Sequence, residues 1–110
     1  MNGRVEKEYE INLDEGGVIR VRRSSIRGRI IAFTVQYEPL VEGRFLPAVR
    51  YDTAHGRAHR DTLDWRGRPI PSLKEWLPAS MDFNEAFTFA EQDLKTKWPE
   101  YLAAFLRRRR

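Results

Sequence analysis

The sequence contains no cysteine, which excludes disulfide-stapled scaffolds, thiolate metal sites and cysteine nucleophiles. It also lacks any apolar run close to the roughly 20 residues that span a bilayer. Residues 1–8 have no apolar segment of the kind found in signal peptides. Together these absences predict a soluble, cytoplasmic protein that does not partner with a membrane.

Glycine-rich phosphate loops, serine nucleophile elbows and the aromatic motifs of common RNA-binding domains are also missing. No stretch has the composition of a linker or an internal repeat. The chain does have enough apolar surface to fold, because 41% of its 110 residues are hydrophobic and its 3 Trp, 4 Tyr and 6 Phe are large. Length and composition predict a single domain over residues 1–110.

Positive charge is concentrated in the middle and at the end of the chain. Residues 1–17 carry two basic and five acidic side chains, residues 18–68 carry 11 and five, and residues 69–106 carry three and six. Four arginines, Arg107 to Arg110, then end the chain. Arginine binds phosphate well because its planar guanidinium donates several hydrogen bonds, so the pattern is compatible with a nucleic-acid surface. Solvated strand faces and a frayed helix end explain it equally well.

Alternating and β-branched residues predict about five antiparallel strands within residues 5–66. The candidate strands cover residues 6–13, 18–23, 30–37, 49–52 and 59–65, with a loop over residues 39–47. The last two strands form a hairpin.

Two helices are expected within residues 72–107. Ser72 with Glu75, and Asp82 with Glu85, have the spacing of a capping box. An apolar stripe follows over residues 83–94, and Pro99 interrupts or restarts it before residues 101–106. The fold class predicted is therefore α+β, with an antiparallel sheet and two C-terminal helices packed on one face.

The predicted hairpin holds both histidines of the chain, His55 and His59. On a helix this spacing would suit zinc, but the local residues favour a turn between strands. In an extended chain, residues four apart lie roughly 13 Å from each other. We therefore predict no metal site and no cofactor.

Two hairpin registers are possible. A two-residue loop, His55-Gly56, places Asp52 opposite His59 and Arg50 opposite Asp61. A three-residue loop, Ala54-His55-Gly56, instead sets His59 and Asp61 on one face with Tyr51, Leu63 and Trp65. We favour the second register because it separates apolar from charged residues. A histidine and a carboxylate on an apolar face must be hydrogen-bonded, and such groups are candidate acids and bases.

RNA cleavage without metal needs a base, an acid and cations around the phosphate. We assign His59 as base and His55 as acid, with Asp61 beside His59 and Tyr51 as an orienting group. The nucleic-acid-binding candidates are Arg50, Arg57, Arg60, Arg107 and Arg108. In the alternative, His55 merely precedes a turn glycine, and His59 is a strand residue bonded to Asp52 or Asp61.

Residues 50–61 resemble the central motif of small prokaryotic proteins related to the TumE-family toxins. Tyr51, Asp52, Gly56, His59 and Arg60 match that motif, whereas Asp61 replaces its second histidine. The resemblance covers about 15 residues and the order of strands before helix. It implies a toxin of a toxin–antitoxin pair that acts on RNA and has a cognate antitoxin protein as partner.

Three hypotheses about function therefore remain open. The first is a small RNA-directed toxin with its site at the hairpin. The second is a non-catalytic module that binds nucleic acid or protein. In that case the phosphates of the nucleic acid would contact Arg20, Arg22, Arg27 and Arg29. The third is a scaffold or antitoxin-type partner. The sequence leaves the substrate, the partner and the oligomeric state open.

Overall fold

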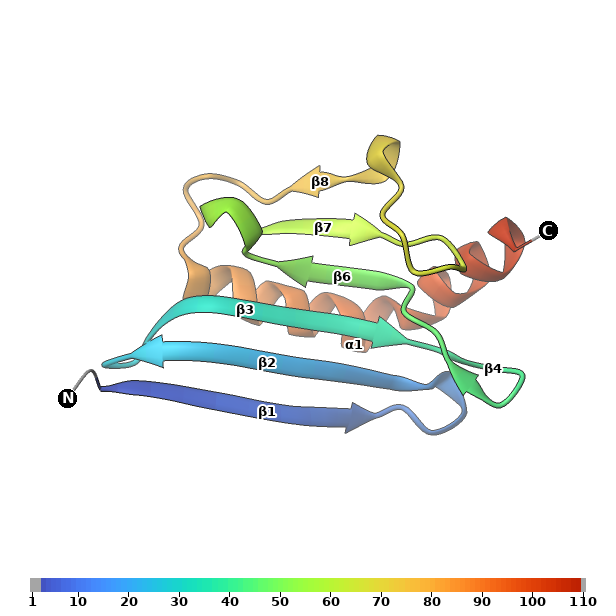
Figure 1. Ribbon diagram of the computed structural model, residues 1–110, viewed down its shortest axis with the longest axis horizontal. Coiled ribbons are helices and arrows are strands. Elements are labelled where there is room, and N and C mark those ends of the chain that lie inside the picture. Colours follow the sequence, from blue (N-terminus) through green and yellow to red (C-terminus); the bar gives the residue numbers. More distant parts are fainter. Residues whose placement is uncertain (1–2, 110) are drawn as a thin grey trace.

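The computed structural model describes residues 3–109, so Arg110 of the basic tail lies outside the described residues. In that part of the chain, strands precede one α-helix, α1 (Phe83–Arg108), which runs behind the sheet in Figure 1. The strands are β1 (Arg4–Asn12), β2 (Val18–Ile26), β3 (Arg29–Glu38), β4 (Leu40–Val41), β5 (Arg44–Phe45), β6 (Val49–Asp52), β7 (His59–Thr62) and β8 (Glu75–Trp76). Three short 3-10 turns are η1 (Asp14–Gly16), η2 (Ala54–Gly56) and η3 (Pro71–Leu73).

Six strands form one antiparallel sheet in the order β1-β2-β3-β6-β7-β8, and β4 pairs with β5 in a separate hairpin (Figure 1). The predicted α+β class with an antiparallel sheet is confirmed. The expected count of about five strands is wrong, because β8 adds a sixth strand at the edge next to β7. The loop predicted over residues 39–47 also contains the two short strands β4 and β5.

The prediction of two C-terminal helices is wrong, because α1 continues without a break through Pro99. Proline removes one backbone hydrogen bond from a helix interior. Here one apolar stripe spans the proline and packs on the sheet, which favours a single helix: Leu94, Trp98, Tyr101, Leu102 and Phe105. Although α1 is long, it has no stretch apolar enough to cross a membrane.

The capping-box spacing of Ser72 and Glu75 does not start an α-helix. A 3-10 turn, η3, occupies Pro71–Leu73, and the next residues are extended as β8. In β8 the backbone of Trp76 lies opposite His59 of β7. Pairing with a strand edge satisfies backbone groups that a single isolated helical turn leaves open.

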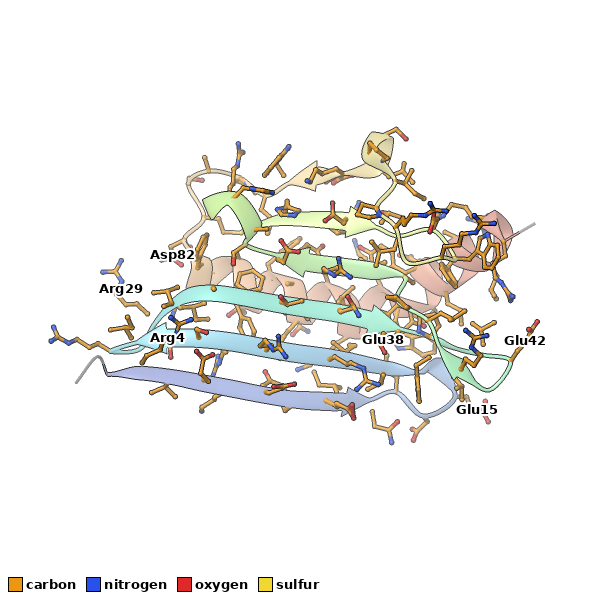
Figure 2. All side chains as sticks on the ribbon, viewed as in Figure 1. Arg4, Glu15, Arg29, Glu38, Glu42 and Asp82 are labelled. Carbon is orange, nitrogen blue, oxygen red and sulfur yellow. The ribbon has the colours of Figure 1, made fainter. Side chains whose placement is uncertain are left out.

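The sheet has one face against α1 and one open face. Side chains that alternate toward α1 form the core and are at most 1% exposed: Ile19, Val21, Val35, Tyr37, Val49 and Tyr51. The open face carries polar and charged side chains along the same strands (Figure 2, where Arg29 and Glu38 mark the two ends of β3). This division follows from the two-residue period of a strand.

In the hairpin of β6 and β7, Asp52 lies opposite His59 and Arg50 lies opposite Asp61. The favoured register, with a three-residue loop, is therefore wrong, and the alternative register is the observed one. Because a slip of one residue moves every side chain to the other face, His59 and Asp61 do not share a face with Tyr51. The predicted strand 59–65 also ends earlier, at Thr62.

The loop between β6 and β7 explains this register. His55 and Gly56 both have positive φ angles, 67° and 80°. The backbone N–H of Ala54 donates to Oδ1 of Asp52 at 2.9 Å, and the N–H of Gly56 donates to the carbonyl of Thr53 at 3.0 Å. Histidine in the left-handed region is uncommon, so the sequence pattern predicted this conformation for glycine alone.

The capping box predicted at the start of α1 is confirmed. Replacing Asp82 by alanine removes this cap and should lower the free energy of unfolding by about 1 kcal/mol. Asp82 accepts from the N–H of Glu85 at 2.8 Å, and Glu85 accepts in return from the N–H of Asp82 at 3.0 Å. Urea denaturation followed by circular dichroism measures the loss. The exposed Glu100→Ala variant, in the middle of α1, is the control and should change stability by less than about 0.5 kcal/mol.

Candidate functional site

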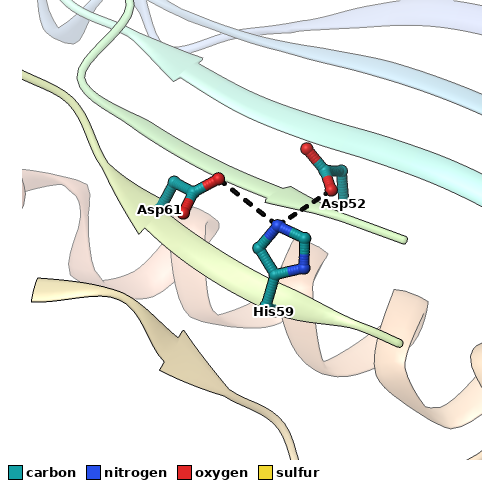
Figure 3. A group of neighbouring side chains, drawn as sticks. All are labelled: Asp52, His59 and Asp61. Atoms are coloured by element: carbon teal, nitrogen blue, oxygen red, sulfur yellow. Dashed lines mark ion pairs between the residues drawn. The ribbon is translucent and has the colours of Figure 1, made fainter. Parts of the chain in front are cut away.

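Three side chains from β6 and β7 converge on the open face of the sheet (Figure 3). Nε2 of His59 lies 3.0 Å from Oδ1 of Asp52 and 3.3 Å from Oδ2 of Asp61. Cross-strand pairing brings Asp52 to His59, and the two-residue spacing along β7 brings Asp61 to the same face. We call these three residues the Asp–His–Asp cluster. His59 thus lies on a strand and contacts both of the aspartates named in the alternative.

The second ring nitrogen of His59 also faces an oxygen. Nδ1 lies 3.0 Å from the carbonyl oxygen of Arg57. Both ring nitrogens of His59 therefore have oxygen partners. The side chain is 2% exposed, so these contacts satisfy polar atoms that water cannot reach.

The carboxylates of the cluster have further partners. Asp52 accepts from the N–H of Ala54, and Nζ of Lys74 lies 3.8 Å from Oδ1 of Asp61. The three ligand atoms of the cluster lie within 4.8 Å of one another, so they could hold a divalent cation in place of the ring proton. The Arg57 carbonyl would then orient the imidazole from behind. His55 does not belong to this set.

The structure separates the four residues predicted to be catalytic. His59 and Asp61 are in contact, as expected. His55 is exposed at the loop tip, and its side chain has no partner within residues 3–109. Tyr51 points to α1, on the other side of the sheet from His59.

Tyr51 instead belongs to a polar network between the sheet and α1. Its hydroxyl donates to Oδ2 of Asp93 at 2.7 Å, and the hydroxyl of Tyr101 donates to the same oxygen. Arg60 donates from Nη1 to Tyr101 at 3.1 Å, and its Nη2 lies 3.1 Å from Oε1 of Glu75. Burial, followed by the bond to Asp93, raises the pKa of Tyr101 to about 12 and raises the pKa of Tyr51 further.

An exposed aromatic surface lies next to the Asp–His–Asp cluster. The indole of Trp76 contacts the imidazole of His59 in a tilted arrangement, with ring centroids 5.1 Å apart, yet Trp76 is 47% exposed. The guanidinium carbon of Arg57 lies 5.4 Å, and Nζ of Lys74 lies 5.0 Å, from the centroid of the indole. We call Arg57, Lys74 and Trp76 the Trp76 surface. Sequence reasoning missed its last two members, although Lys74 and Trp76 have the spacing that puts two strand residues on one face.

The arginines predicted to bind phosphate along β2 are paired with acids instead. Nε of Arg20 lies 2.7 Å from Glu38, and the same guanidinium also contacts Glu10. Arg22 lies 3.6 Å from Glu8. Their charges are therefore largely neutralised on the open face.

The other predicted phosphate-binding arginines lie in several places. Arg50 donates from Nε to Gln36 at 2.7 Å on the open face. Arg107 is exposed in the last turn of α1, whereas the neighbouring Arg108 is partly buried. Arg60 is held in the network on the α1 side. The structure thus does not gather these cations into one continuous surface.

A comparison with protein families finds one match, which covers residues 4–110 and is described as "Domain of unknown function (DUF7718)". The chain belongs to this family. No curated protein and no solved structure matches the sequence. Since the family description names no activity, the resemblance to TumE-family toxins stays a prediction.

Replacing His59 by glutamine should lower the free energy of unfolding by about 2 kcal/mol, because glutamine cannot remake the buried contacts of the imidazole with Asp52, Asp61 and the carbonyl of Arg57. Urea denaturation at pH 7 measures this loss. The exposed His55→Asn variant is the control and should differ from wild type by less than about 0.5 kcal/mol, since asparagine tolerates positive φ. Equal stability of the two variants would contradict the assigned role of His59.

Stability should fall as the pH rises from about 10 toward 12. Burial is the main cause of the raised pKa of all four tyrosines: Tyr9, Tyr37, Tyr51 and Tyr101. The unfolded chain loses these protons near pH 10, so ionisation favours unfolding above that pH. Absorbance at 295 nm should show no tyrosine ionisation near pH 10 in the folded protein, and urea denaturation at pH 9 and pH 11 gives the slope.

Proposed function

We propose that this protein binds single-stranded RNA on the Trp76 surface. The observation that carries this proposal is a half-exposed indole with a guanidinium and an ammonium against its ring. An aromatic face stacks an unpaired base at about 1–3 kcal/mol per base, whatever the sequence. Neighbouring cations bind the phosphates on either side of that base.

The platform is held in place before any ligand arrives. The backbone of Trp76 pairs with β7, and its ring rests on the imidazole of His59. The Asp–His–Asp cluster in turn holds that imidazole. A platform fixed in this way loses little conformational entropy on binding, which favours affinity.

The charge of Arg57 also supports this surface as the binding site. Within residues 3–109, Arg57 has no carboxylate partner, and Nη2 donates to the carbonyl of Leu77 at 3.1 Å. Arg20 and Arg22, by contrast, are paired with glutamates. A phosphate therefore competes with no carboxylate at Arg57, whereas it would have to displace one at either β2 arginine.

RNA cleavage is a second candidate function, and it would make the protein a toxin with a protein antitoxin as partner. The position of the Asp–His–Asp cluster directly beneath the Trp76 indole favours it. An imidazole held by carboxylates is a suitable acid or base for the 2′-hydroxyl and the leaving oxygen of RNA. Trp76 covers this ring, so cleavage requires the indole to move off His59.

The binding proposal is tested with a fluorescently labelled 12-nucleotide RNA by fluorescence anisotropy. Wild-type protein should bind saturably, and Trp76→Ala should weaken binding by about tenfold or more, through loss of stacking. Trp65→Ala is the matched control, because Trp65 is 48% exposed and has Arg66 against its ring. Arg57→Gln should lower the slope of log affinity against log salt by about 0.7.

Equal losses for the Trp76→Ala and Trp65→Ala variants would show that RNA binding is not localised to the Trp76 surface. Circular dichroism checks that Trp76→Ala folds, and Trp76→Phe, which keeps a ring, should retain part of the affinity. The same RNA on a denaturing gel tests cleavage. Shortening by wild type but not by folded His59→Gln supports the second candidate, together with growth arrest on expression, whereas intact RNA contradicts it.

A further inference from the structure

A second group of cations lines a pocket on the α1 side of the β8 edge, between β7, η3 and the last turns of α1. Its polar lining residues include Arg60, Thr62, Ser72, Lys74, Tyr101 and Arg108, of which Tyr101 already donates its hydroxyl proton to Asp93. Among the described lining residues, the one carboxylate is Glu75, whose side chain is 67% exposed and already pairs with Arg60. The ammonium of Lys74 lies beside Asp61 on the open face, so the two guanidinium groups of Arg60 and Arg108 face one exposed acid in this pocket.

Two buried nitrogen atoms of the lining residues have no hydrogen-bond partner. They are Nε of Arg60 and Nε of Arg108. Within residues 3–109, no other buried side-chain nitrogen or oxygen is left in this state. Buried donors without a partner are rare in native proteins and often mark the place of a bound ion. That both belong to one pocket points to a ligand there that accepts hydrogen bonds.

Arg108 also lacks an ion pair within residues 3–109. Burial lowers the pKa of its guanidinium, and the charge of neighbouring Arg107 lowers this pKa further. The negative end of the α1 dipole favours a cation in this turn. The dipole does not explain why the Nε of Arg108 is buried away from water. An anion bound in the pocket would explain it.

We propose that this pocket binds a phosphate monoester group. The guanidinium groups of Arg60 and Arg108, both with an unpaired Nε, and the hydroxyl groups of Thr62 and Ser72 offer more donors here than the two oxygens of a carboxylate can use. The three terminal oxygens of a monoester accept from several such donors at once, and its charge of nearly −2 matches the excess of cations. The group belongs either to the end of an RNA strand or to a small phosphorylated metabolite.

This inference does not rest on the proposed RNA binding. Trp76 lies on the open face of the sheet, whereas Arg60 and Tyr101 lie on the α1 side. Lys74 belongs to both regions, because it lines the pocket and contacts the indole. Each region can therefore be tested separately with variants that do not touch Lys74.

Isothermal titration calorimetry with inorganic phosphate tests the pocket, with sodium chloride held at equal ionic strength. Wild type should bind one phosphate per chain, and Arg108→Gln should weaken binding at least tenfold. Arg107→Gln is the matched control, because it removes the same charge from the neighbouring exposed residue, and its affinity should stay within twofold of wild type. No saturable binding, or equal weakening by both variants, overturns the proposal. The proposal is also overturned if acetate binds to the pocket with the same affinity as phosphate.

Two further ligands distinguish the sources of the phosphate. A 12-nucleotide RNA with a 5′-phosphate is compared with the same RNA ending in a 5′-hydroxyl, and uridine 5′-monophosphate is titrated alone. If the pocket serves an RNA end, the 5′-phosphate raises affinity and Arg108→Gln removes only that gain. If it serves a metabolite, the mononucleotide binds and phosphorylation of the RNA has no effect. Trp76→Ala should leave phosphate binding unchanged, so failure of the RNA proposal is seen separately.

Discussion

A histidine that is 2% exposed lies between two carboxylates on β6 and β7, and both strands must keep their register to hold it there. If the pairing shifted by one residue, Asp52 would move away from His59 and the buried imidazole would lose a hydrogen-bond partner. The same histidine supports the ring of Trp76 on β8. The arrangement of the β6–β8 edge therefore depends on this single buried imidazole and its partners.

Pairing between β1 and β2 explains the uneven charge of the sequence. Glu8 and Glu10 of the acidic N-terminal segment lie directly opposite Arg22 and Arg20 of the arginine-rich segment. Opposite charges across an antiparallel pair attract, and the pairs keep this open surface nearly neutral. The excess of arginine in the middle of the chain is therefore not in itself a sign of a nucleic-acid surface on these strands. Arg57, beside β8, and Arg108, near the end of α1, have no such carboxylate partner among the described residues.

The two candidate binding regions lie on opposite faces of the same sheet edge. On the open face, an indole with flanking cations suits a base and its phosphates. On the α1 side, partly buried guanidinium groups suit a terminal phosphate. Lys74 contacts both regions, so a strand end that wraps around β8 would connect them. The family description names no activity, so both candidate regions at this edge remain proposals.

The sequence by itself determined the class of fold, the main strands, the start of α1 and the proximity of His59 to Asp61. Each of these follows from contacts between residues near in sequence: alternation along a strand, the stripe of a helix, and the capping box of Asp82 and Glu85. The tertiary structure alone decided the register of the β6–β7 hairpin, the continuity of α1 through Pro99 and the position of Trp76. These three features depend on contacts between residues that are far apart in the sequence. Examples are the packing of the apolar stripe around Pro99 on the sheet and the pairing of β8 with β7. The sequence contains no local pattern that predicts a positive φ angle at His55 or a strand as short as β8. Both features are therefore seen only in the folded chain.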